Sequence, residues 1–320
     1  MNLPSRFDAL GGSRFQVVWE DGDRAFYRAW SREADGSHAA VLVVQSTAEH
    51  PTPASLDRLT HEYGLRDELD SAWAVRPFEL VRKDGRTLLL LEDAGGEPLS
   101  QLLGGPTEVE RFLRIAIGIV WALGKVHQRG LVHKDVKPAN ILMSANGEVK
   151  LTGFGIASRL PRERQAPEPP ETIAGTLAYM APEQTGRMNR SVDARSDLYA
   201  LGVTLYEMLT GALPFSATDP MEWVHCHIAR KPVPPSERLA NIPAAVSAIV
   251  MKLLAKTAEE RYQTAGGLER DLRRCLAEWE AQGHIEDFAL GQHDSAAPGS
   301  GVSWSATLAR GCGRCPQPPA

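Results

Sequence analysis

One stretch, Val132-His-Lys-Asp-Val-Lys-Pro-Ala-Asn-Ile-Leu142, constrains the fold of this chain more than any other. It places an acid, a base and an amide within six residues, as Asp135, Lys137 and Asn140. The apolar pair that closes the stretch predicts the start of a strand. Taken alone, these residues leave two interpretations open: a solvated polar loop, or a loop that carries chemistry.

The bulk composition is that of a globular chain with ample material for a core. The 320 residues suit one large domain or two lobes that share a cleft, and 43% of them are hydrophobic. A formal net charge of −5 argues against nucleic acid or an anionic membrane as the main partner. The sequence has no apolar run of about 18 residues and no apolar segment after Met1 that would indicate a signal peptide.

The four cysteines are too few for a disulfide framework at this length, so a reducing cytoplasm is the expected location. Cys312-Gly-Arg-Cys315 has the spacing of a metal-binding pair, but no second pair lies near it in the sequence. Two free thiols in a loose tail are therefore favoured over a zinc or redox site.

The first part of the chain has the period-2 alternation of strands. Five strands are predicted, over residues 15–19, 26–30, 39–44, 78–81 and 87–91. The first two are joined by Glu20-Asp-Gly-Asp23, which carries the Asp-Gly turn signal. One helix is expected over 54–69, from apolar residues near a 3.6 period.

The rest of the chain is dominated by helical periodicity. Helices are predicted over about 112–126, 197–209, 246–254 and 268–279, and the second of these is expected to be buried on nearly every side. Segment 161–171, dense in Pro, Glu and Arg, is expected to be a mobile surface segment. The predicted divisions are an arm at 1–13, a β-rich lobe at 14–93, a helical lobe at 94–290 and a disordered tail at 291–320.

The 132–142 stretch resembles the catalytic loop of protein kinases, H-R-D-x-x-x-x-N, with Lys134 in the arginine position. Ala181-Pro-Glu183 resembles the A-P-E motif, and Asp197, five residues before Gly202, resembles the buried aspartate of the kinase core helix. The resemblance covers about residues 14–285. It implies an α+β, bilobal protein-kinase fold with a small β-rich N-lobe and a mainly helical C-lobe.

Two further matches refine this resemblance. Lys137 and Gly175-Thr176 before Tyr179 resemble the serine/threonine branch of the family. Residues 175–190, with 61–63 and 91–96, resemble large sensor proteins in which a kinase-like module precedes an ATPase-like domain, a GAF-type sensor and a histidine kinase. Sensor and histidine-kinase signalling components are then the implied partners, and 291–320 is interpreted as a truncation or a reading-frame artefact.

The resemblance also implies roles at the site. Asp135 would accept the proton of the attacking hydroxyl, Lys137 would stabilise the moving phosphoryl group, and Asn140 would bind Mg²⁺. The further residues expected at ATP are Glu92, Ala94 and Gly22. In the helical lobe, Glu183 and Arg261 are expected to form a partly buried ion pair, and Thr176 is expected to bond the region of Asp135 and Lys137.

The nucleotide side departs from the family pattern. The three positions of the Gly-rich loop hold Trp19, Asp21 and Arg24, with acidic neighbours that would repel a triphosphate. Leu42 replaces the phosphate-pairing lysine, and Gly153 replaces the Mg²⁺-binding aspartate of D-F-G. Glu62 takes the position of that lysine's partner with no cation to meet; a surface helical glutamate is the other interpretation.

These departures leave two functions open. The first is a pseudokinase or very weak kinase that acts as a regulatory or interaction module of a sensor protein. The second is an active serine/threonine kinase with non-standard nucleotide and Mg²⁺ ligation. ATP and Mg²⁺ are the cofactors of the second, and the first needs none. A protein is the expected partner or substrate of either, with no nucleic acid and no membrane.

Overall fold

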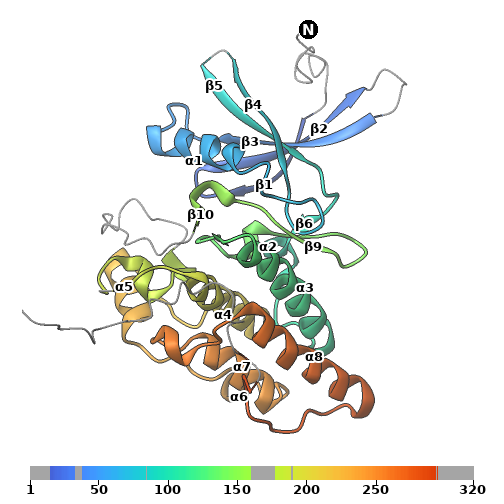
Figure 1. The fold of residues 1–320 in the computed structure, drawn as a ribbon, viewed down its shortest axis with the longest axis vertical. Helices are drawn as coiled ribbons and strands as arrows, with labels where there is room; N and C mark the ends of the chain where they lie inside the picture. The colour runs from blue at the N-terminus through green and yellow to red at the C-terminus, as the bar shows by residue number, and fades with distance from the viewer. Residues whose placement is uncertain are drawn as a thin grey trace, which may run out of the picture.

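The computed structural model describes residues 15–32, 38–83, 85–159, 177–188, 190–292 and 294. A β-rich N-terminal part stands above a helical C-terminal part, so the predicted α+β bilobal architecture is confirmed (Figure 1). The predictions for the arm at 1–13, for segment 161–171, for Thr176 and for Cys312 and Cys315 lie outside the described residues. The same is true of nearly all of 291–320.

The N-terminal part is built on one antiparallel sheet. Its strands are β1 (Phe15–Asp21), β2 (Arg24–Arg32), β3 (His38–Ser46), β4 (Pro77–Lys83) and β5 (Arg86–Glu92), in the order β1-β2-β3-β5-β4. All five predicted strands are present. The first two are longer than expected, which shortens their connection to the two residues Gly22 and Asp23. Gly22 has φ +59°, the left-handed conformation that such a tight hairpin requires.

Helix α1 (Pro53–Gly64) packs on this sheet beside β4 and β5 (Figure 1). Thr52 caps it, because the threonine hydroxyl accepts a hydrogen bond from the backbone N–H of Ser55 at 3.2 Å. The predicted helix over 54–69 was wrong at its C-terminal end, since the chain runs as turns after Gly64. Leu65 is the C-cap residue, and its backbone N–H bonds the backbone oxygen of Glu62 at 3.2 Å.

The C-terminal part is a set of helices with short strands and turns between them. The helices are α2 (Leu99–Leu102), α3 (Val109–Gln128), α4 (Ala194–Thr210), α5 (Pro220–Ile228), α6 (Pro235–Arg238), α7 (Ala244–Leu253) and α8 (Ala265–Gln282). The short strands are β6 (Glu97–Pro98), β7 (Leu131–Val132), β8 (Ile141–Met143), β9 (Val149–Leu151) and β10 (Ser158–Arg159). Single 3₁₀ turns cover Pro138–Asn140, Phe154–Ile156, Leu177–Tyr179, Pro182–Thr185 and Ala258–Glu260.

Helix α4 is the centre of this lobe, and it is buried on nearly every side, as predicted. Asp193 caps its first turn, and Gly211, with φ +72°, ends it. Gly202 lets α7 come close, because a Cβ at this position would lie 2.7 Å from the Cβ of Leu253. The long helices α3 and α8 run against each other along one side (Figure 1). In the described part of the chain, no helix is long and apolar enough to cross a membrane.

The 132–142 stretch lies where the two lobes meet. It leaves β7 and enters β8, and both strands are held by antiparallel partners: β10 pairs with β7, while β6 and β9 flank β8. The strand predicted after Asn140 is therefore confirmed. Because the loop is fixed at both ends by hydrogen-bonded strands, its polar side chains are presented from a rigid base.

Candidate functional site at the lobe boundary

Asp197 of α4 fixes the start of the loop from below. Its two carboxylate oxygens accept the backbone N–H groups of His133 and Lys134, each at 2.8 Å, and His127 lies 2.9 Å away through Nε2. Asp197 is fully buried. These bonds hold Lys134 at φ +66°, a left-handed conformation that costs a side-chain-bearing residue about 1–2 kcal/mol. The loop is thus held in a strained shape by a buried carboxylate.

The three polar residues singled out in the sequence converge. Asn140 donates from Nδ2 to the backbone oxygen and to Oδ2 of Asp135, both at 2.8 Å. Lys137 Nζ lies 3.4 Å from Asp135 Oδ2. Asp135 Oδ1 is buried without a hydrogen-bond partner among the described residues. All three side chains are less than a tenth exposed, so the solvated-loop interpretation is wrong.

The turn between β1 and β2 brings two more charges into this cluster. Asp21 Oδ2 lies 3.0 Å from Lys137 Nζ and 2.8 Å from Arg24 Nη2. Arg24 Nη2 also donates to Asn140 Oδ1 at 3.3 Å and lies 3.7 Å from Asp135 Oδ2. Sequence reasoning treated Asp21 only as a repulsive acid and Arg24 as its local counter-charge. It missed that both reach the catalytic-loop residues more than 100 positions away.

In this cluster, the attraction between opposite charges affects the pKa values of Asp21 and Arg24 more than burial does. Burial acts to raise the pKa of Asp21, but the charges of Lys137 and Arg24 hold that pKa below its usual value. Burial acts to lower the pKa of Arg24, but Asp135, Glu62 and Asp21 together raise it. Asp21 therefore stays a carboxylate and Arg24 stays a cation inside a largely buried pocket.

Glu62 is an interior residue of the site, so the surface-glutamate interpretation is wrong. The residue is 2% exposed, and its Oε1 accepts the backbone N–H of Gly153 at 3.2 Å. Burial raises the pKa of Glu62, while the charge of Arg24 and the N–H groups of Gly153 and Phe154 oppose that rise. The expectation that Glu62 has no cation to meet was incomplete, because the positive charge of Arg24, at the start of β2, acts on the carboxyl of Glu62.

The backbone of Gly153 packs closely against the side chain of Asn140. It has φ +83°, and a Cβ built on it would lie 2.6 Å from Asn140 Cγ and Oδ1. Mg²⁺ prefers several oxygen ligands in octahedral geometry. Here the Asn140 oxygen is bonded by Arg24, and position 153 supplies no carboxylate. Among the described residues no group of three or more His, Cys, Asp or Glu could hold a metal. The residues present do not fit Mg²⁺.

Two large apolar side chains fill the upper side. The indole of Trp19 stacks on Phe26 with ring centroids 4.1 Å apart, and Trp19 is 5% exposed. Leu42, in the position of the expected lysine, belongs to the same buried cluster, as does Leu142 from the strand after the loop. Ala94 packs against this cluster. The space between the sheet and the loop is therefore occupied by the chain's own side chains.

Three of the residues expected at ATP lie apart from the charged cluster. Glu92 ends β5, and its carboxylate accepts from the hydroxyl of Ser71 at 2.5 Å and lies 3.5 Å from Arg76. Ala94 follows in the segment that connects the lobes. Gly22 is at the apex of the β1–β2 turn, where a Cβ would meet nothing within 4 Å. The structure brings none of the three against Asp135.

The scaffold beneath the site contains a second, fully buried charge pair. Arg261 donates from Nη1 and Nη2 to the two oxygens of Glu183 at 2.7 and 2.9 Å. The two side chains are 0% and 3% exposed. Ser196 also donates to Glu183, at 2.7 Å. The predicted ion pair is confirmed, and it is more deeply buried than expected.

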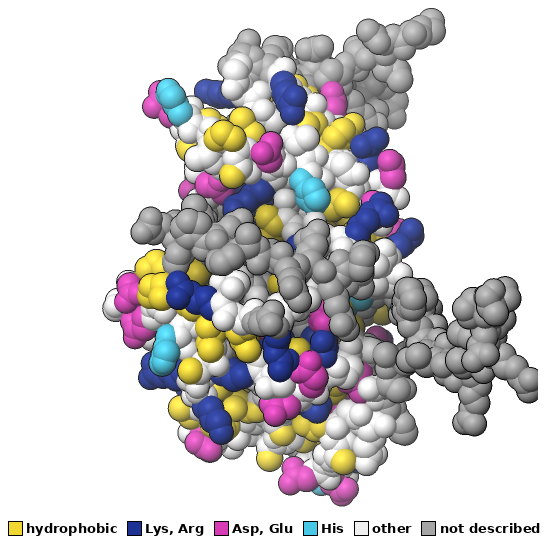
Figure 2. Space-filling model, turned by 60° about the vertical axis from the view of Figure 1, so that its left-hand side comes forward, with side chains coloured by type: hydrophobic (Ala, Val, Ile, Leu, Met, Phe, Trp, Pro, Cys, Tyr) yellow, Lys and Arg dark blue, Asp and Glu magenta, His cyan; other side chains and the backbone are white. Residues whose placement is uncertain are grey.

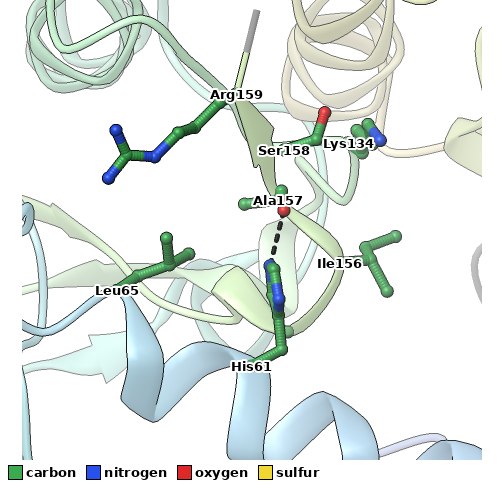
Figure 3. A pocket seen from close by; sticks show the side chains of 8 residues that line it. His61, Leu65, Lys134, Ile156, Ala157, Ser158 and Arg159 are labelled. Carbon is green, nitrogen blue, oxygen red and sulfur yellow. Dashed lines mark hydrogen bonds between the residues drawn. The ribbon is translucent and has the colours of Figure 1, made fainter. Parts of the chain in front are cut away.

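A separate cavity lies between α1 and residues 155–159 (Figure 3). It measures about 390 Å³, and Figure 3 shows His61 pointing toward the backbone oxygen of Ala157, to which its Nε2 is hydrogen-bonded at 2.6 Å. Arg159 and Ser158 line its other side. Lys134 is the one lining residue that comes from the 132–142 stretch, so this cavity is not the Asp135 cluster.

Comparison with known proteins agrees with this geometry. A family model described as "Protein kinase domain" matches residues 25–271. The serine/threonine-protein kinase PknB of Mycobacterium tuberculosis (strain H37Rv) is 36% identical over 257 residues, which cover 79% of this chain and 36% of that protein. PknB of Mycobacterium leprae is 35% identical over the same length and coverage. A probable serine/threonine-protein kinase of Streptomyces coelicolor is 37% identical over 190 residues, covering 59% of this chain and 28% of that protein. The chain thus spans well under two thirds of the length of these relatives.

Proposed function

The chain belongs to the protein kinase family, and from its altered cleft we propose that it is a serine/threonine kinase-like regulatory module with little or no phosphotransfer. The observation that carries this proposal is the position of Arg24. Its guanidinium contacts Asn140 Oδ1 at 3.3 Å and lies 3.7 Å from Asp135 Oδ2. The Arg24 guanidinium thus lies beside the Asn140 oxygen, which the family resemblance assigns to the metal ion. It also lies beside the Asp135 carboxylate, which the resemblance assigns to the attacking hydroxyl.

The apolar end of the cleft supports the same proposal. Trp19 lies in the cluster that includes Leu142 and that Ala94 covers. A nucleotide base that entered between the sheet and Leu142 would have to displace a buried indole stacked on Phe26. Burying a large aromatic side chain contributes on the order of 2–3 kcal/mol, which a base would need to replace before it gained any affinity.

The expected rate of phosphoryl transfer supports the same proposal. Losing one preorganised charge-stabilising group costs about 10²–10³ in rate. Leu42 and Gly153 remove a lysine and a carboxylate, and the glycine cradle is absent as well. Such losses are not additive, yet a usual kinase rate of roughly 1–100 s⁻¹ would fall below about 10⁻³ s⁻¹. That is too slow for ordinary signalling turnover.

A protein is the partner that we propose for this module. On the face shown in Figure 2, Lys and Arg side chains are interspersed with Asp and Glu over both lobes, which suits a protein better than a polyanion. We place the module within a larger sensor protein, with histidine-kinase signalling components as partners, on the resemblance of residues 175–190. The low cysteine content keeps a reducing cytoplasm as the expected location.

One observation favours a second candidate, an active kinase with displaced ligands. The charge of Arg24 acts on Glu62 and could supply from β2 the positive charge that Leu42 does not supply from β3. The relatives in Mycobacterium tuberculosis and Mycobacterium leprae are named serine/threonine-protein kinases. Asp135, Lys137 and Asn140 are all in place for such a reaction. For this candidate, position 153 supplies no carboxylate to hold the metal, because it is a glycine.

The two candidates are separated by melting the protein with and without Mg·ATP. A ligand at 100 times its dissociation constant raises the free energy of unfolding by about 2.7 kcal/mol. We expect no shift of Tm at millimolar nucleotide, and a clear shift would favour the active kinase. In a parallel assay, incorporation of labelled phosphate that disappears in Asp135→Asn would contradict the proposed function.

A further inference from the structure

We infer that Lys256 of the helical lobe is a reactive lysine that takes an acyl group from an activated donor, an acyl phosphate or an acyl thioester, and that this modification loosens α5. Lys256 follows α7 and contacts α4 and α5. Its surroundings share no residue with the Asp135 cluster. The inference therefore goes beyond the proposed function and does not depend on whether the cleft binds nucleotide.

The amine of Lys256 is surrounded by groups that carry no negative charge. Nζ donates to the backbone oxygen of Cys226 at 3.0 Å and lies 3.4 Å from the hydroxyl of Tyr199. It also lies 4.6 Å from the ring centre of Phe215. Among the described residues, no ion pair joins Lys256 to a carboxylate. The side chain thus lacks the acidic partner that would favour its charged form.

Tyr199 and His227 extend this cluster with two more neutral groups. The hydroxyl of Tyr199 lies 3.0 Å from Nδ1 of His227. Burial raises the pKa of Tyr199 above its ordinary value, so the phenol keeps its proton. His227 is 1% exposed, and its Nε2 has no hydrogen-bond partner among the described residues. A lysine, a phenol and an imidazole therefore meet in a largely dry, aromatic environment without an acid.

This environment favours the nucleophilic form of the lysine. Burial lowers the pKa of Lys256 to about 8; the charge of Arg261 acts in the same direction, and the thiol of Cys226 opposes it. At about pH 7.4 such an amine is neutral about a fifth of the time, against roughly one part in a thousand for an ordinary lysine. Desolvation and a neighbouring cation are established ways of activating a lysine nucleophile.

The acyl transfer needs no oxidant and no metal ion. The lone pair of Nζ forms a bond to the acyl carbon, and the bond from that carbon to the phosphate oxygen or thioester sulfur breaks. Phosphate or thiolate leaves with the electron pair, and the surplus proton of Nζ passes to solvent. The product is an uncharged amide, so the cation–π contact with Phe215 is lost and the bond to Cys226 of α5 is weakened.

The test treats the full chain with acetyl phosphate at about pH 7.4 and follows each lysine by mass spectrometry of its peptides. Lys252 is the matched control, because it is also half-buried and also lies over an aromatic ring, that of Tyr262 at 5.5 Å. We expect Lys256 to be acetylated about tenfold or more faster than Lys252, since its weaker basicity offsets only part of the gain in neutral amine. A parallel arm with acetyl-coenzyme A separates the two classes of donor.

Three further measurements make the result decisive. The rate at Lys256 should level off above about pH 8, while the rate at Lys252 keeps rising. In concentrated urea the two rates should become similar. Hydrogen exchange of the α5 amides should be severalfold faster in the acetylated chain and in Lys256→Gln than in Lys256→Arg, which keeps the charge.

Equal acetylation of Lys256 and Lys252 in the folded chain would overturn the inference, as would a rate at Lys256 that urea does not change. Fast acetylation with unchanged exchange of α5 would overturn its second part. If Lys256→Gln fails to fold by circular dichroism, the acetylated wild type carries the same measurement.

Discussion

The two buried charge clusters of this molecule, one on each side of the catalytic loop, differ in whether sequence motifs predict their ion pairs. Beneath the catalytic loop, Glu183 pairs with Arg261 and Asp197 holds two backbone N–H groups, in the pattern that the sequence motifs predict. Above the loop, Asp21 and Arg24 make ion pairs that no motif predicts. A kinase fold can therefore keep the buried ion pairs of its scaffold while charged side chains of its own N-lobe pair with the catalytic-loop residues in the cleft.

The largest expected effect is on the lower cluster. Arg261→Ala leaves the carboxylate of Glu183 buried, with Ser196 as its one side-chain donor among the described residues, so we expect a loss of about 3–5 kcal/mol in the free energy of unfolding. Denaturant titration measures this loss. Arg273→Ala is the matched control, since it removes an exposed arginine paired with Glu269 and should cost less than about 1 kcal/mol. Equal losses in the two variants would contradict a scaffold held by buried charge.

The second effect is a pH dependence carried by His227 on α5. Burial, with the nearby charge of Lys256, lowers the pKa of His227 to about 4. Below about pH 6.5, His227 is protonated in the unfolded chain but stays neutral in the folded chain. The free energy of unfolding therefore falls as the pH drops from about 6.5 to about 4. The full contribution is on the order of 3 kcal/mol.

Unfolding curves across that pH range test the His227 prediction. His227→Gln should flatten the fall in stability, although it also removes the contact between Nδ1 and the hydroxyl of Tyr199. His225→Gln, on the exposed side of the same helix, is the matched control and should retain the wild-type slope. A wild-type slope in His227→Gln would contradict the assignment.

The third effect is on the upper cluster. Arg24→Met keeps an unbranched apolar stem but leaves Asp21 and Asp135 with Lys137 as their remaining cation, so we expect a loss of about 1–3 kcal/mol. Thermal melting at low and high salt measures it. Because the cluster is largely buried, salt should change the loss little. Arg28, on the same strand as Arg24, forms a more exposed ion pair with Asp93. The loss of stability in Arg28→Met therefore provides the comparison.

The smallest effect is on Gly153. Gly153→Ala places a methyl group 2.6 Å from the amide of Asn140 and forces a side-chain-bearing residue to φ +83°, so we expect a loss of about 1–2 kcal/mol in the free energy of unfolding. Gly64→Ala is the control, because its new methyl group would meet no atom within 4 Å beyond its chain neighbours and the adjacent backbone of its own helix. That variant should be neutral or slightly stabilising. A neutral Gly153→Ala would mean that Asn140 moves freely, contrary to its three bonded contacts.

Much of the architecture follows from local pattern. Period-2 alternation located the five strands, and helical periodicity located α4, α7 and α8, because each buries one repeating set of side chains against the core. The motif positions of Asp197 and Glu183 predicted their burial. The C-terminal end of α1 was misjudged, since apolar spacing continues past Gly64 although the helix does not.

The sequence by itself determined the kinase fold, the convergence of Asp135, Lys137 and Asn140, and the loss of the expected lysine and aspartate at Leu42 and Gly153. Only the tertiary structure decided what replaces those charges. Asp21 and Arg24 meet the catalytic loop because hairpin closure sets their direction and lobe packing sets their distance. Contacts between segments more than 100 residues apart leave no periodic signal, so neither the Asp21–Lys137 pair nor the partner of Glu62 could be read along the chain.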